Sequence, residues 1–314
     1  MSMPMEQKTD YLIKLVDSAK NTKSIVCMGL DPVVEAMPTG FISGDDGHPF
    51  MVHFFAEIFS EMKQQNVLPG AFKPNHGFYL KFDKPREKNF NGSVCLTNIM
   101  SLVEEMFPGT PIILDYKRGD IAKSSQNYAE EGFDCWNADA VTISPYMGTD
   151  SVTPFTKYCN NEQGKGVYVL NRTSNPGAKD FQNCFVSSGA GSNHGMPLYE
   201  IVANYIANTW SKDAPGVGAV VGATSLEELS SLAKFYAGKD IPMLIPGVGG
   251  QGGKADEVAA KLREASYDLS LARINVSSEL THPWVKKKES APADFAKVCV
   301  EALFKLNEQI RYRP

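Results

Sequence analysis

Two acids and two bases directly follow a short apolar run in this chain. The run 110–114 is followed by Asp115, Lys117, Arg118 and Asp120. If the backbone stays extended, side chains two positions apart point the same way, so the carboxylate of Asp115 and the ammonium of Lys117 would converge on one small volume. Charges at the C-terminal tip of a buried parallel strand would meet the mouth of a sheet or barrel. An enzyme site is therefore the expected reason for this sequence.

A further lysine stands at the tip of another predicted strand. Lys73 comes directly after two apolar residues and before Pro74, a place where a lysine would otherwise lie among apolar neighbours. We expect its ammonium to pair with Asp115 or Asp120. A structural salt bridge would explain one such pair. Lysines and aspartates gathered at strand tips instead predict an alternating charge network built for a site.

A glycine-rich segment, 247–253, follows one predicted strand and precedes a helix predicted to begin near Ala255. Its backbone N–H groups would be free to cradle an anion, so a phosphate site is predicted. The segment also satisfies the dinucleotide fingerprint G-x-G-x-x-G. That fingerprint normally lies in the first βα unit of its domain, whereas this segment lies in the seventh. Its position favours the phosphate site of a barrel, where Arg273 could add a bidentate contact. The same glycines could also form a turn that binds no ligand.

Composition and charge are those of an ordinary globular protein. The chain has 314 residues, 43% of them hydrophobic, and a formal net charge of −5. Neither nucleic acid nor an anionic membrane is therefore an expected partner, and no apolar run reaches the ~18 residues of a membrane span. The cysteines are scattered without a C-x-x-C pair, which is typical of reduced thiols in a cytoplasmic protein. The histidines show no metal-ligand spacing, and no metal is expected.

Apolar, β-branched runs alternate with helical stretches along the chain. Eight such βα units predict a (β/α)₈ barrel, a TIM barrel, as a single domain over residues 1–314, with a doubly wound sheet as the alternative. Residues 5–20 have the pattern of an amphipathic helix. The segment 171–197 is a long loop that could be a mobile lid or an insertion without a role. The predicted strands are 24–30, 70–72, 111–114, 138–143, 166–170, 216–221, 241–245 and 271–276.

Taken together, these segments resemble the longer form of orotidine 5′-phosphate decarboxylase, from about residue 25 to residue 280. The pattern D-x-K-x-x-D over 115–120 is shared with sugar-phosphate decarboxylases and aldolases of the same superfamily. The full set of segments in this order is much more specific. The segments are Gly29-Leu30-Asp31-Pro32, Phe72-Lys73-Pro74-Asn75, Asp115 to Ile121, Ser144 to Ser151, Val220 to Thr224 and Pro246 to Gly253.

The resemblance implies a homodimer that converts orotidine 5′-monophosphate to UMP and CO₂ in de novo pyrimidine biosynthesis without a cofactor or metal. It also implies two sets of site residues. The catalytic set is Lys73, Asp115, Lys117 and Asp120. The substrate-binding set is Asp31, Asn75, Ile121, Ser124, Thr173, Pro246, Gln251, Gly252 and Arg273.

The resemblance gives several of these residues a specific role. Gln251 and Arg273 match the residues that hold the phosphate, Thr173 and Pro246 match those beside the pyrimidine, and Asp31 falls on the ribose contact. Three others, Asp120, Ile121 and Ser124, would reach into the site of the partner subunit. Association with orotate phosphoribosyltransferase is a further interaction that the resemblance suggests.

Loss of CO₂ from C6 of orotate leaves a carbanion without an adjacent carbonyl, so electrostatic stabilisation must replace an electron sink. Lys117 is expected to stabilise that carbanion and then protonate it. The nearest rival is a 3-keto-gulonate 6-phosphate decarboxylase, which would use the same acids to hold Mg²⁺. The chain could also be an NAD-dependent oxidoreductase or a nucleotide-binding barrel without catalytic activity.

Overall fold

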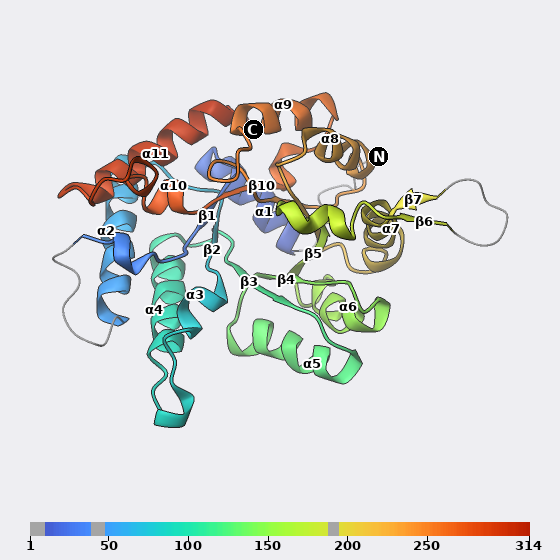
Figure 1. Cartoon of the computed structure of the whole chain (residues 1–314), viewed down its shortest axis with the longest axis horizontal. Coiled ribbons are helices and arrows are strands. Elements are labelled where there is room, and N and C mark those ends of the chain that lie inside the picture. Colours follow the sequence, from blue (N-terminus) through green and yellow to red (C-terminus); the bar gives the residue numbers. More distant parts are fainter. Residues whose placement is uncertain (1–9, 39–47, 188–194) are drawn as a thin grey trace.

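The computed structural model describes residues 10–38, 48–187 and 195–314, and its centre is one ring of parallel strands (Figure 1). The sheet has eight strands in the order β2-β1-β10-β9-β8-β5-β4-β3. Each predicted apolar run overlaps one of them. The strands are β1 (Val26–Gly29), β2 (Ala71–Lys73), β3 (Ile113–Arg118), β4 (Ala140–Ile143), β5 (Gly166–Arg172), β8 (Val217–Val221), β9 (Met243–Ile245) and β10 (Ala272–Val276).

The two ends of this sheet, β2 and β3, meet through parallel bridges that close the ring. Phe72 bridges to Ile112, and Asn75 bridges to Asp115. The backbone N–H of Asp115 donates to the carbonyl of Pro74 over 3.0 Å. Sequence neighbours therefore remain neighbours around a closed ring, which confirms the predicted (β/α)₈ barrel and makes the doubly wound alternative wrong.

Helices surround the barrel because the strands are buried on both faces and need an apolar cover. The buried apolar side chains of strands and helices form one continuous cluster. The helices are α1 (Asp10–Thr22), α2 (His48–Gln65), α3 (His76–Leu80), α4 (Asn91–Met106), α5 (Ala122–Glu130), α6 (Thr149–Thr156), α7 (Leu198–Tyr205), α8 (Leu226–Tyr236), α9 (Ala255–Glu264), α10 (Ser278–Thr281) and α11 (Phe295–Ile310).

Helix α1 lies across the N-terminal end of the barrel. The Ser18 hydroxyl donates to the carbonyl of Gly70, directly before β2, over 2.8 Å. Leu12, Leu15 and Ala19 share the buried face of this helix, as its amphipathic pattern predicts. The helix predicted over 5–20 is thus present from residue 10, and 5–9 lie outside the described residues.

The segment predicted as a long loop, 171–197, is partly ordered into regular structure. Strands β6 (Phe185–Val186) and β7 (Met196–Pro197) pair antiparallel and project from the barrel (Figure 1). Its Gly/Ser-rich centre, 188–194, lies outside the described residues. No helix in the described ranges is long and apolar enough to cross a membrane.

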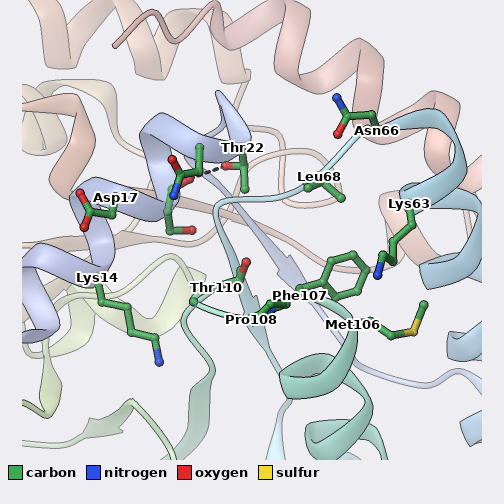
Figure 2. A pocket seen from close by; sticks show the side chains of 13 residues that line it. Lys14, Asp17, Thr22, Lys63, Asn66, Leu68, Met106, Phe107, Pro108 and Thr110 are labelled. Atoms are coloured by element: carbon green, nitrogen blue, oxygen red, sulfur yellow. Dashed lines mark hydrogen bonds between the residues drawn. The ribbon is translucent and has the colours of Figure 1, made fainter.

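A cavity of about 440 Å³ opens at the N-terminal end of the barrel, among α1, α2 and the segment after α4 (Figure 2). Lys14, Lys63, Phe107 and Thr110 are among the side chains that line it. None of the predicted site residues does. This cavity is therefore separate from the strand tips at which the chemistry was predicted.

Candidate active site

Three of the predicted catalytic residues meet at the tips of β2 and β3. The Lys73 ammonium lies 2.8 Å from Oδ2 of Asp115, and the Lys117 ammonium lies 2.5 Å from Oδ1 of the same carboxylate. The side chains of Lys73 and Asp115 are 4% and 8% exposed, whereas that of Lys117 is 49% exposed. The predicted pairing of Lys73 with Asp115 is thus present, and Lys117 is the member of the network that a ligand can reach.

Asp115 and Lys73 stay ionised although both side chains are buried. Burial alone would raise the pKa of the Asp115 carboxyl, but the two neighbouring ammonium groups outweigh it and hold that pKa well below its usual range. Burial likewise would lower the pKa of Lys73, but the carboxylates of Asp115 and Asp31 keep it above its ordinary value. Two lysines face Asp115, and the carboxylate of Asp31 lies near enough to Lys73 to act on its pKa, so the charges of these four groups balance. The half-exposed ammonium of Lys117 is the charge that a negatively charged group of a ligand can reach.

The backbone of β3 does not stay extended through Lys117, which was the condition for the two side chains to point the same way. Pairing with β4 shifts register between Leu114 and Arg118, and Lys117 has a φ of 45°, in the left-handed region that non-glycine residues rarely adopt. The carboxylate of Asp115 and the ammonium of Lys117 still converge, but they do so across an irregular strand end. A strained backbone at this position is typical of functional sites.

Thr142 of β4 also belongs to this network, although it was not predicted from the sequence. Its hydroxyl donates to Oδ1 of Asp115 over 2.8 Å and accepts the backbone N–H of Lys117 over 3.1 Å. The available signal was a hydroxyl in an otherwise apolar strand, Ala140–Ile143. The bond itself could not be predicted, because it depends on the register between β3 and β4.

Asp31 and Asn75 lie beside the network at the tips of β1 and β2. The backbone N–H of Asn75 donates to the Asp31 carboxylate over 3.1 Å. The side-chain oxygen of Asn75 accepts the N–H of Gly77 and caps α3. Both side chains are half-buried. Asp31 lies near enough to Lys73 to act on its pKa, and Asn75 follows Lys73 by two positions in the chain.

Asp120, Ile121 and Ser124 lie at the start of α5, after β3. The Asp120 carboxylate accepts the N–H of Ile121 over 2.7 Å, and no ion pair within the described ranges joins it to Lys73 or Lys117. Ile121 is 59% exposed. Within one subunit the structure therefore separates this group from the Lys73–Asp115–Lys117 network.

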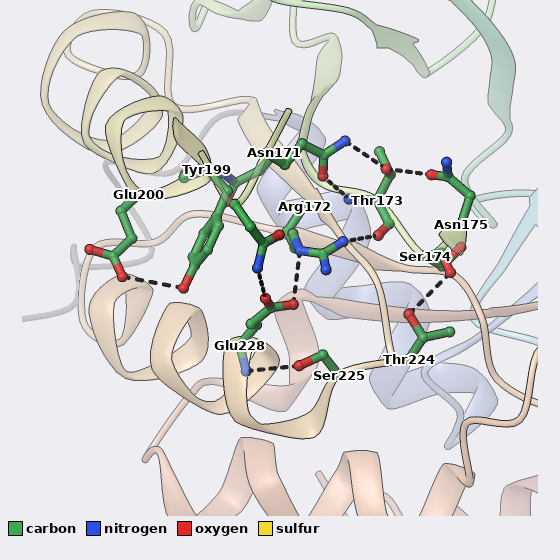
Figure 3. Close-up of polar contacts among 12 residues, drawn as sticks. Asn171, Arg172, Thr173, Ser174, Asn175, Tyr199, Glu200, Thr224, Ser225 and Glu228 are labelled. Atoms are coloured by element: carbon green, nitrogen blue, oxygen red, sulfur yellow. Dashed lines mark hydrogen bonds and ion pairs between the residues drawn. The ribbon is translucent and has the colours of Figure 1, made fainter. Parts of the chain in front are cut away.

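The loop after β5 is fixed by a polar network around Thr173 (Figure 3). Gln182 accepts the N–H of Thr173 over 2.9 Å and donates to its hydroxyl over 2.8 Å. That hydroxyl in turn donates to the side chain of Asn175 over 2.6 Å. Arg172 donates to the carbonyl of Thr173 and pairs with Glu228 at 2.8 Å. Thr173 is thus held in a defined orientation at the mouth.

The loops after β5, β8 and β9 approach one another closely at Ser174. A methyl group added at Gly222 would lie 2.8 Å from the Ser174 backbone, and one at Gly247 would lie 2.9 Å from the Ser174 side chain. Gly247 also has a φ of 95°. Glycine is therefore required at both positions. The half-buried Pro246 stands directly before Gly247, so this contact brings it near the Thr173 loop.

The glycine-rich segment 247–253 forms a tight loop whose amides are only partly free. The N–H groups of Gly249, Gly252 and Gly253 bond to carbonyls within the loop. Those of Gly250 and Gln251 make no hydrogen bond to any described residue. Fewer backbone N–H groups are thus available to a phosphate than predicted, and that of Gly252 is not among them.

Arg273 does not lie at the mouth, and its predicted phosphate contact is wrong. The side chain is fully buried and donates to the carbonyls of Leu15, Gly70, Ser270 and Ala272 over 2.6–3.0 Å. Those carbonyls lie on α1 and at the N-terminal end of the strands. Arg273 therefore links α1 to the N-terminal end of the barrel. As the second residue of β10, it lies near the start of the strand, at the end opposite the site.

Comparison with known proteins agrees with this geometry. A model of the orotidine 5′-phosphate decarboxylase / HUMPS family matches residues 55–282, from α2 to the residue after α10. The orotidine 5′-phosphate decarboxylase of Cupriavidus metallidurans is 36% identical over 291 residues, which are 92% of this chain and 94% of that protein. This chain belongs to the orotidine 5′-phosphate decarboxylase family.

Solved structures of the family share the barrel. The OMP decarboxylase of Leishmania donovani superposes with a TM-score of 0.69 at 28% identity, covering 96% of this chain and all of that one, 100%. The UMP synthase of the same organism superposes with a TM-score of 0.70 at 30% identity, covering 97% of this chain. This chain spans 57% of that UMP synthase. The strands of the present chain form a ring and have no doubly wound order. The structural basis of the oxidoreductase hypothesis is therefore absent from the described residues.

Proposed function

We propose that this chain is an orotidine 5′-phosphate decarboxylase, which releases CO₂ from orotidine 5′-monophosphate and forms UMP, and that Lys117 is its catalytic acid. Family membership supports the reaction. The observation that carries the catalytic assignment is the pair of lysines on Asp115, one buried and one half-exposed at the mouth of the barrel.

The chemistry requires a positive charge beside C6 of the pyrimidine. When the C6–carboxylate bond breaks, its electron pair stays on C6, and the Lys117 ammonium would interact more strongly with that carbanion than with the intact substrate. Transfer of a proton from Nζ to C6 would then complete UMP and leave a neutral amine. Lys73 would serve a different purpose, because its buried ammonium keeps Asp115 ionised.

The occupied oxygens of Asp115 support the metal-free reaction over the Mg²⁺-dependent sugar-phosphate reaction. One oxygen accepts from Lys73, and the other accepts from Lys117 and Thr142. A carboxylate that binds Mg²⁺ must present an oxygen to the cation. Here the ammonium groups stand where such a cation would have to approach.

Substrate contacts are proposed for the half-buried groups around the mouth. Asp31 and Asn75 would face the ribose, and Thr173 and Pro246 would border the pyrimidine. For the phosphate, we propose the free amides of the glycine-rich loop together with the exposed side chain of Gln251. Because the phosphate lies far from C6, its binding energy would contribute to catalysis by holding the substrate in place.

A homodimer with shared sites is proposed from the group at the start of α5. Asp120, Ile121 and Ser124 would enter the partner's site beside Lys117. Exposed apolar side chains support an interface here, because Ile121 is joined by Tyr146 and Met147, which are 83% and 50% exposed on the next loop. A cytoplasmic location and association with orotate phosphoribosyltransferase belong to the same proposal.

The test is turnover after removal of metals. We expect EDTA-treated protein to consume orotidine 5′-monophosphate, followed by the loss of its absorbance, and to release CO₂ and UMP. Lys117→Ala should abolish turnover while UMP binding, measured by calorimetry, persists. Lys234→Ala, on the exposed face of α8, is the matched control and should retain full turnover. Turnover that returns only with Mg²⁺, or with a sugar phosphate as substrate, would support the metal-dependent sugar-phosphate decarboxylase instead.

A further inference from the structure

Among the described residues, Thr142 has the one side-chain hydroxyl that forms hydrogen bonds with both Asp115 and Lys117. It lies on β4, is 1% exposed, and pairs in register with Tyr168 of β5. Its oxygen lies 2.8 Å from Oδ1 of Asp115 and 3.1 Å from the backbone nitrogen of Lys117. It therefore contacts the carboxylate and the main chain of the lysine at once.

The direction of both hydrogen bonds follows from the chemistry of the groups. A backbone N–H can only donate, so the Thr142 oxygen accepts from Lys117. An ionised carboxylate can only accept, so the single hydroxyl hydrogen points to Asp115. Asp115 remains ionised because the two ammonium groups outweigh its burial. Thr142 is thus locked in one orientation.

The irregular end of β3 explains why this bond is needed. Between Leu114 and Arg118 the ladder to β4 is interrupted, so the N–H of Lys117 has no regular strand partner. Lys117 also holds a φ of 45°, a conformation that a residue with a side chain adopts only at an energetic cost. The Thr142 hydroxyl supplies a partner for that N–H and fixes the backbone from which the Lys117 side chain projects.

We propose that Thr142 is a positioning residue, which holds the Lys117 backbone and the Asp115 carboxylate in the relative placement that proton transfer to the substrate requires. The inference rests on the proposed function of Lys117. Thr142 itself would not touch the substrate, since Asp115 and the Lys117 backbone occupy its hydroxyl. Its loss should therefore slow the reaction step and spare binding.

The experiment compares Thr142→Val, which keeps the β-branched shape without the hydroxyl, with Thr142→Ser, which keeps the hydroxyl. We expect kcat to fall about 10- to 100-fold in the valine variant, as for loss of a buried hydrogen bond to a charged group, and to stay near the wild-type value in the serine variant. UMP affinity should be unchanged in both. A valine variant that keeps the wild-type kcat would overturn the proposal, as would a serine variant as slow as valine.

A control separates this role from a general loss of stability. Ser18→Ala also removes a buried hydroxyl, whose 2.8 Å bond to Gly70 lies at the other end of the barrel, and it should leave kcat unchanged. If the valine variant does not fold, Thr142→Ala serves in its place with the same expectations.

Amide hydrogen exchange gives a readout that does not require turnover. Exchange at Lys117 should accelerate in the valine variant, and unchanged exchange would contradict the proposal even if the wild-type reaction proved to be another one.

Discussion

At the scale of single residues, Asp115 joins two lysines that come from different strands. Its carboxylate is buried, so the free energy of its ionised form depends on the donors around it. Removal of the carboxylate would leave Lys73 as a buried cation without its ion-pair partner. Removing one partner of a buried ion pair costs much more free energy than replacing both partners by apolar residues.

We therefore predict that Asp115→Asn lowers the free energy of unfolding by about 3–5 kcal/mol and abolishes turnover. The measurement is urea unfolding followed by tryptophan fluorescence. Replacing Lys73 by Met in the same chain should recover part of the stability but none of the activity. Glu257→Gln breaks an exposed pair with Lys254 and should leave the free energy of unfolding nearly unchanged. A loss of similar size in the two single variants would contradict the buried-pair argument.

The residues of this network could be predicted from the sequence because packing of the fold rarely explains several charged residues at the tips of apolar runs. Their pairing partner was also predictable, since the extended-strand assumption still brought Asp115 and Lys117 together. The strand irregularity at Lys117 and the bond to Thr142 could not be predicted. Both depend on the register of two strands, and one residue of shift changes which side chain faces the carboxylate.

At the scale of elements, the apolar runs predicted every strand of the barrel, because a strand buried on both faces has to be apolar throughout. Their ends were less accurate. The third run was expected to stop at Leu114, whereas β3 continues to Arg118. Arg273 was placed at the wrong end of β10, although its position near the start of the strand already indicated the N-terminal side. The phosphate assignment rested on the phosphate site that such barrels carry after their last strands and on the resemblance, and neither takes account of which end of the strand holds the residue.

The short helix α10 ends at a buried histidine, and this gives the fold a pH dependence. His282 stacks on Phe54 of α2 at 5.0 Å and contacts Trp284 edge-on at 5.7 Å. Burial among these apolar rings lowers the pKa of His282 from 6.5 to about 4. The unfolded chain thus binds a proton at a higher pH than the folded one. Stability from this group is complete above the unfolded pKa and is lost as pH falls towards the folded pKa.

We predict that the free energy of unfolding falls by about 3 kcal/mol more between pH 7 and pH 4 in the wild-type chain than in His282→Gln. Urea unfolding at a series of pH values gives this difference directly. An equal slope in the wild-type and His282→Gln chains would show that His282 is not buried in its neutral form.

At the scale of the whole molecule, closure of the barrel brings the tips of β1, β2, β3 and β4 to one mouth. The charge network, the Thr173 loop and the glycine-rich loop meet there although they are far apart in the sequence. The opposite end is closed by α1 and Arg273 and holds a separate cavity. Asp120 is the predicted catalytic residue that one subunit does not bring to Lys117. The complete site is therefore proposed to need a second subunit.

The most direct test of a site built from Lys117 of one subunit and Asp120 of the other mixes two inactive proteins. Lys117→Ala and Asp120→Ala should each lack turnover alone. After subunit exchange, confirmed by native mass spectrometry, each mixed dimer would contain one intact site, so about a quarter of the wild-type activity should return. Recovery near that level is the predicted result. Exchanged dimers without recovered activity would contradict the shared site and leave Asp120 without its proposed role.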